Sequence, residues 1–176
     1  MIDPENKEAE KKSPSGQPLT GAALEQTERE ILAYNLRDIF RLSPESTDFL
    51  LRTWDAIQFF DDLADNTPTT REALDKTIWD FFIGLSQNQF FQKYIVALQS
   101  QLATMILKWQ ASDRAERAGS ADARSFVWRA GYYDLILFCF ACEYGADKAK
   151  VAALAILGSY GEKFEDYQKE FPCQPL

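Results

Sequence analysis

Residues 127–142, VWRAGYYDLILFCFAC, are the stretch that decides the fold. Apolar side chains occupy nearly every side of a helix drawn through them, and such a helix belongs inside a protein rather than on its surface. We therefore predict a central helix over about residues 121–144, enclosed by the others. Gly131 costs about 1 kcal/mol against alanine inside a helix, which indicates close approach of a neighbouring backbone, and Gly145 is placed to end the helix.

The segments on either side also show helical periodicity, and almost none alternates with the period of two that half-buried strands require. Proline, glycine and Ser or Thr cap signals divide these segments into further helices. The expected helices cover about residues 22–41, 44–66, 71–85, 89–118 and 147–171. The sequence thus predicts an all-α, single-domain bundle of about six helices.

Length and composition set the domain boundaries. The chain has 176 residues, 46% of them hydrophobic, which is enough for one sizeable core. We assign the helical bundle to residues 21–171. Residues 1–20 are polar and rich in Pro, Gly and Ser, so we expect a flexible or partner-ordered N-terminal arm there. Residues 172–176 form a short tail.

The charge of the chain narrows the range of partners. A formal net charge of −8 argues against direct binding to nucleic-acid phosphates and to anionic membrane surfaces. No charge-free apolar run approaches the roughly 20 residues of a spanning helix. The first residues also lack the apolar core of a signal peptide, so we expect an intracellular protein that is not secreted.

The absence of histidine excludes catalytic triads and metal sites that use imidazole. The three cysteines are too few and too irregular for a disulfide framework. Cys139 and Cys142 form a C-x-x-C pattern within the apolar central helix. We interpret them as small core residues one helical turn apart rather than as a redox or metal pair.

Four charged residues should lie in or near the core. Residues 53–66, TWDAIQFFDDLADN, form an amphipathic helix with Asp61 at the edge of its apolar stripe, while Arg129 and Asp134 belong to the apolar central helix. Because a buried ion needs a partner, we predict that Arg129 pairs with Asp61 or Asp65. The partner of Asp134 stays open among Arg124, Arg52 and Lys163.

The acids Asp61, Asp62 and Asp65 resemble the DDxxD motif of isoprenyl diphosphate synthases and class I terpene synthases. That resemblance implies a Mg²⁺-dependent diphosphate enzyme in which these three carboxylates hold the metal. It covers five residues, and the chain has neither a second acidic motif on a later helix nor a basic cluster for a diphosphate. We therefore expect no catalytic residue, metal or cofactor, and keep the Mg²⁺ enzyme as an alternative.

Phe90, Phe91 and Tyr94, near the start of a long helix, are candidates for an exposed partner-binding patch. Core packing is the competing interpretation, because aromatic residues at helical spacing more often face a core.

Taken together, residues 54–66 and 125–145 resemble small, all-helical, acidic proteins of tailed bacteriophages. This resemblance implies a virion structural or assembly protein that binds other virion proteins, first in the host cytoplasm and then in the virion. A homo-oligomer is also open. An alternative is an intracellular inhibitor whose acidic surface occupies the nucleic-acid-binding site of a host protein.

Overall fold

The computed structural model describes residues 21–172, with side chains from Thr27 onward. Every regular element in this range is a helix, so the predicted all-α fold class is confirmed. None of these helices combines the length and the apolarity that crossing a membrane requires. The predicted arm, residues 1–20, and all of the predicted tail except Pro172 lie outside the described residues.

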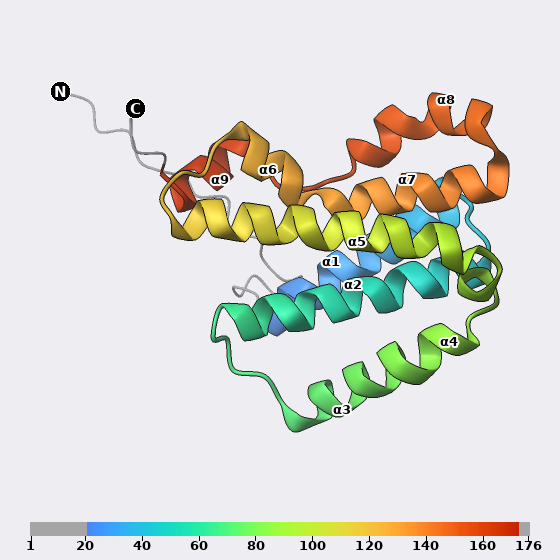
Figure 1. The fold of residues 1–176 in the computed structure, drawn as a ribbon, viewed down its shortest axis with the longest axis horizontal. Coiled ribbons are helices and arrows are strands. Elements are labelled where there is room, and N and C mark those ends of the chain that lie inside the picture. The colour runs from blue at the N-terminus through green and yellow to red at the C-terminus, as the bar shows by residue number, and fades with distance from the viewer. Residues whose placement is uncertain (1–20, 173–176) are drawn as a thin grey trace, which may run out of the picture.

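The helices form one bundle with two flanking elements. In chain order they are α1 (Gly21–Tyr34), the π-helical turn η1 (Asn35–Ile39), α2 (Pro44–Ala64), α3 (Arg71–Trp79), the π-helical turn η2 (Asp80–Gly84), α4 (Leu85–Gln87), α5 (Gln89–Arg117), α6 (Ala123–Arg129), α7 (Gly131–Tyr144), α8 (Ala146–Leu157) and α9 (Phe164–Glu170). Helices α2, α5 and α7 run alongside one another, while α3 flanks α2 and α8 flanks α7 (Figure 1).

Local cap signals place two helix starts where the sequence predicts them. The Ser43 hydroxyl accepts a hydrogen bond from the Ser46 N–H at 3.2 Å, with Pro44 in the first turn of α2. Ser43 also donates its own N–H to the Glu143 carboxylate at 3.1 Å, which ties the start of α2 to the end of α7. Thr70 caps α3 in the same way.

The prediction of one continuous helix over residues 121–144 is wrong. The chain leaves helical geometry at Ala130, where φ is −70° and ψ is 8°, and α7 begins at Gly131. A Cβ added at Gly131 would lie 3.7 Å from the Met105 Cα of α5. At that distance an alanine side chain would make only ordinary van der Waals contact, so the close backbone approach predicted for Gly131 is not confirmed, and Gly131 lies at a helix start rather than within a helix.

The break turns α6 onto the end of α5 and onto α9. The Tyr167 hydroxyl of α9 donates to Ser125 Oγ of α6 at 2.8 Å, and the rings of Phe126 and Tyr167 are 5.4 Å apart. The Ser112 hydroxyl of α5 donates to the Ser125 carbonyl at 2.8 Å. These buried contacts form only if α6 departs from the axis of α7.

The predicted helix over residues 147–171 is likewise two helices, α8 and α9. Residues 158–163 connect them and include Gly158 and Gly161, which weaken helix continuation. This connection brings Tyr160 back to the bundle, with its ring 5.4 Å from that of Tyr133.

The core lies between α1, α2, α5 and α7. Its fully enclosed apolar side chains include Leu36, Phe49, Leu50, Leu98, Leu135 and Ile136. Cys139 is fully buried and Cys142 packs against the same cluster, so their interpretation as core residues is confirmed. Burial raises the pKa of both thiols above the ordinary value of a cysteine, and both thiols therefore stay protonated.

Candidate functional site

Arg129, at the end of α6, is the centre of a partly buried charge cluster. Its Nη1 donates to Glu116 Oε1 at 3.5 Å, and its Nε lies 4.0 Å from Glu162 Oε2. The guanidinium carbon also lies 5.8 Å from the ring centre of Tyr167 and 5.5 Å from that of Phe171. Arg129 therefore joins α6 both to α5 and to the C-terminal segment through ion pairs and cation–π contacts.

The predicted pairing of Arg129 with Asp61 or Asp65 is wrong. Glu116 takes that place because α6 folds back along α5. Asp61 Oδ1 instead accepts a hydrogen bond from Trp109 Nε1 at 3.1 Å. Burial raises the pKa of Asp61, and the Trp109 hydrogen bond and the charge of Arg129 oppose that rise only in part.

The side chains of Asp61, Asp62 and Asp65 do not all line one cavity. Asp61 on α2 and Asp65 directly after α2, four residues apart, line the same cavity of about 100 Å³, whereas Asp62 does not line it. Within residues 21–172, no group of three or more Asp, Glu, Cys or His side chains is placed to hold a metal ion. Of the three acids that the resemblance assigns to Mg²⁺, only Asp61 and Asp65 therefore share a cavity.

Asp134 lies at the edge of α7 rather than in the core, with its side chain 45% exposed. Its partner is Lys108 of α5, whose ammonium donates to Asp134 Oδ2. The partners considered from the sequence, Arg124, Arg52 and Lys163, are therefore wrong. The pairing across α5 and α7 depends on the helix register, which local pattern does not specify.

Of the two interpretations of Phe90, Phe91 and Tyr94, core packing is confirmed and the partner-binding patch is wrong. Phe90 is buried, and the Phe91 ring lies 5.6 Å from that of Phe49 in the core. The Tyr94 hydroxyl donates to the Cys142 carbonyl at 3.0 Å. These residues fasten the start of α5 to α2 and α7.

Exposed large apolar side chains lie on several helices, and those that include aromatic rings in contact with one another lie on η2 and the end of α2. We define the α3/η2 patch as Phe60, Leu63, Ile78, Trp79, Phe81 and Phe82, all classed as exposed large hydrophobic residues. Trp79 is 66% exposed and Phe82 71%. The Phe81 ring lies 6.4 Å from that of Phe60 and 6.1 Å from that of Phe82, which links α2 to η2 through aromatic contacts.

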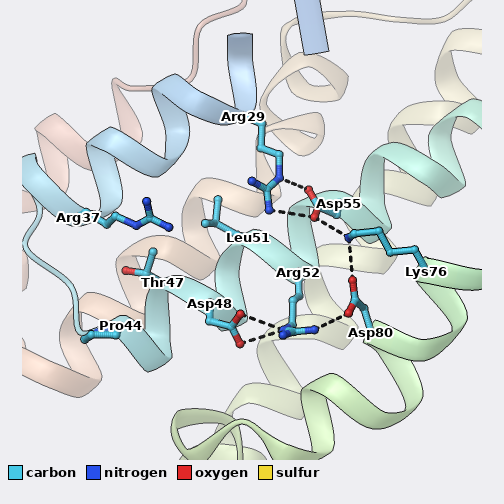
Figure 2. Close-up of a pocket in the computed structure, with 10 residues that line it drawn as sticks. All are labelled: Arg29, Arg37, Pro44, Thr47, Asp48, Leu51, Arg52, Asp55, Lys76 and Asp80. Atoms are coloured by element: carbon cyan, nitrogen blue, oxygen red, sulfur yellow. Dashed lines mark hydrogen bonds and ion pairs between the residues drawn. The ribbon is translucent and has the colours of Figure 1, made fainter. Parts of the chain in front are cut away.

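An ion-pair network holds this segment to the bundle (Figure 2). Lys76 of α3 contacts Asp55 of α2 at 3.2 Å and Asp80 of η2 at 2.7 Å. Arg52 of α2 pairs with Asp80, and Arg29 of α1 pairs with Asp55 at 2.6 Å. Such partly exposed pairs contribute about 0–1 kcal/mol each, and no residue of α3 or η2 is buried. The segment is therefore attached by these ion pairs and by the Phe60–Phe81 ring contact rather than by fully buried side chains.

Comparisons of the chain with protein-family models, with curated proteins and with solved structures found no match. A functional assignment therefore depends on the geometry described above.

Proposed function

We propose that this chain is a non-catalytic protein–protein interaction component that binds its partner through the α3/η2 patch. The observation that carries the proposal is that α3 and η2 contain several large apolar residues but bury none of them. They bury none of their residues, yet they present Ile78, Trp79, Phe81 and Phe82 to solvent. Exposed large apolar side chains in one region of a surface are typical of docking sites, and aromatic anchors supply much of the energy at such sites.

The contribution of the patch to binding affinity can be calculated from its two most exposed aromatic residues, Trp79 and Phe82. Full burial of a large apolar side chain contributes about 1.5–3 kcal/mol. Because Trp79 and Phe82 are 66% and 71% exposed, covering both contributes about 2–4 kcal/mol, or about 30- to 1,000-fold in affinity.

Charge favours a basic partner over a second copy. The net charge of −8 makes two copies repel each other. Asp62 on α2, Asp65 directly after α2 and Glu72 on α3 lie in the segments that carry the patch, and within residues 21–172 none of these three forms an ion pair. An apolar pocket surrounded by Lys and Arg on another protein would complement both features.

We place that partner among the proteins of a tailed-bacteriophage particle, where the chain acts in structure or assembly. The resemblance of residues 54–66 and 125–145 to acidic phage proteins supports this setting. In this setting the chain is in the host cytoplasm during assembly and afterwards in the virion.

The test compares two double variants for incorporation into particles. Trp79→Ser with Phe82→Ser removes the anchors of the patch. The control, Val151→Ser with Leu154→Ser, changes side chains that are 85% and 86% exposed on α8. Quantitative mass spectrometry of purified particles should find the wild type and the control at equal copy number and the patch variant reduced by about tenfold or more.

Circular dichroism melting first establishes that both variants are folded. Absence of the wild-type chain from purified particles would contradict the virion role. Equal incorporation of the patch variant and the wild type would contradict docking through the α3/η2 patch.

A further inference from the structure

A cleft of about 510 Å³, separate from the α3/η2 patch, lies between α1, α2, α5, the junction of α6 and α7, and residues 159–162 of the connection between α8 and α9. Its floor is a continuous row of aromatic rings. Trp54 lies 5.2 Å from Tyr132, which lies 5.8 Å from Tyr133, which lies 5.4 Å from Tyr160, all between ring centres. Trp109 adds a further aromatic wall. The volume falls within the range of about 300–1,000 Å³ that small-molecule sites occupy.

The charges around the cleft are predominantly negative. The charged residues that line it are Glu28, Asp61, Arg129 and Glu162. Arg129 is already paired with Glu116 and Glu162, which leaves it poorly suited to a ligand anion. An anionic ligand would also have to overcome the net charge of the chain, −8.

Asp61 is the carboxylate whose charge is least compensated in the cleft. It accepts a hydrogen bond from the neutral indole of Trp109 at 3.1 Å. Within residues 21–172, no Lys or Arg side chain lies within ion-pair distance of it, although Arg129 acts on it from farther away. Burial raises the pKa of Asp61, so a bound cation would relieve an unfavourable desolvated charge.

We propose that this cleft binds a small organic cation, an alkylammonium or alkylguanidinium, with its charged head at Asp61 and its stem along the rings of Trp54, Tyr132 and Tyr133. A carboxylate supplies the counter-charge, and aromatic faces attract cations while they cover an apolar stem. This site is independent of the α3/η2 patch.

Isothermal titration calorimetry on the full chain tests the proposal with cadaverine and with 1,5-pentanediol, which has the same chain length and no charge. Cadaverine should bind saturably at one site per chain, and pentanediol should not bind. Asp61→Asn should weaken cadaverine binding by about tenfold or more. The control Asp147→Asn removes an equal charge from α8, where Asp147 is almost fully exposed, and should leave affinity within about twofold.

Two results would overturn the proposal: no saturable binding of cadaverine up to about 10 mM, or equal weakening by the Asp61 and Asp147 variants, which would indicate non-specific attraction. The comparison of the two ligands on the wild type keeps the test decisive if a variant fails to fold. A third ligand, Nα-acetyl-lysine methylamide, identifies the source of the cation. Binding as strong as that of cadaverine would indicate a polypeptide side chain, and weaker binding a free amine.

Discussion

Replacing Arg129 by Met tests the charge cluster that joins α5, α6 and the C-terminal segment. The change leaves Glu116, whose side chain is only 11% exposed, without its ion-pair partner. Removing one member of a buried pair costs about 3–5 kcal/mol. The ion-pair contacts of Arg129 are long, at 3.5 and 4.0 Å. We therefore expect the free energy of unfolding to fall by about 3 kcal/mol, the lower end of that range, and the melting temperature to fall by about 6–12 °C.

A double-mutant cycle separates this pairing from a general loss of packing. In the Arg129→Met background, Glu116→Gln removes the orphaned charge and keeps polar atoms near the Ser112 and Tyr167 hydroxyls, whose oxygens lie 2.7 and 2.9 Å from Glu116 Oε1. The double variant should therefore be more stable than the sum of the single losses predicts, by about 1–2 kcal/mol.

Urea unfolding monitored by circular dichroism measures all members of the cycle. The matched cycle of Arg129→Met with Asp61→Asn should give a smaller coupling, because Asp61 lies beyond ion-pair distance of Arg129. If the Glu116 cycle were additive within about 0.5 kcal/mol, the ion pair would contribute nothing to the fold and the reasoning would be refuted.

Three further predictions concern the docking of α3, a buried phenol and a buried thiol. Lys76→Met should reduce global stability by less than about 1 kcal/mol yet speed hydrogen exchange in α3, because Lys76 contacts both Asp55 and Asp80; unchanged exchange would contradict the network. Burial raises the pKa of Tyr133 to about 12, so the folded state holds a proton that the unfolded chain releases near pH 10, and Tyr133 alone should lower stability by about 1.4 kcal/mol per pH unit between pH 10 and 12. Tyr132, Tyr160 and Tyr167, whose pKa burial also raises, add to this fall. Urea unfolding between pH 10 and 12 should show a shallower fall for Tyr133→Phe, and equal slopes would argue against a buried phenol. Cys139, fully buried, should resist iodoacetamide in the native protein and react on unfolding, as followed by peptide mass spectrometry; rapid native labelling would contradict its burial.

The sequence predicts the helical class and the helix starts well because these depend on local chemistry. Ser43 with Pro44, and Thr70 before α3, are cap signals that act over three or four residues, and the structure places them at helix starts. Apolar residues on nearly every side of residues 131–142 correctly indicate an enclosed helix, α7, whereas Val127 in the same apolar stretch is exposed. The same property hides the break at Ala130, because a stretch without a polar face offers no periodicity that could reveal where one helix ends.

The partners of the charged residues could not be derived from local pattern. Arg129 meets Glu116 because α6 folds back on α5, and Asp134 meets Lys108 because of the register between α5 and α7. Both ion pairs depend on how the helices pack against one another. The need of Arg129 for a carboxylate partner was predictable, since a partly buried guanidinium requires one, but the choice among the acids of the chain was not.

The exposed patch was missed for a related reason. Phe90 and Trp79 look alike in sequence, yet one packs in the core and the other faces solvent. One signal was present in residues 78–83, IWDFFI, where apolar side chains cover more sides of the helix than contact with a single neighbour can bury.

Hydrogen exchange of the free and the particle-bound protein tests docking through the α3/η2 patch most directly. We expect strong protection of peptides that cover residues 71–87 on binding, with little change in α8, which carries Val151 and Leu154. Protection confined to α8, or none at α3 and η2, would contradict the proposed docking surface.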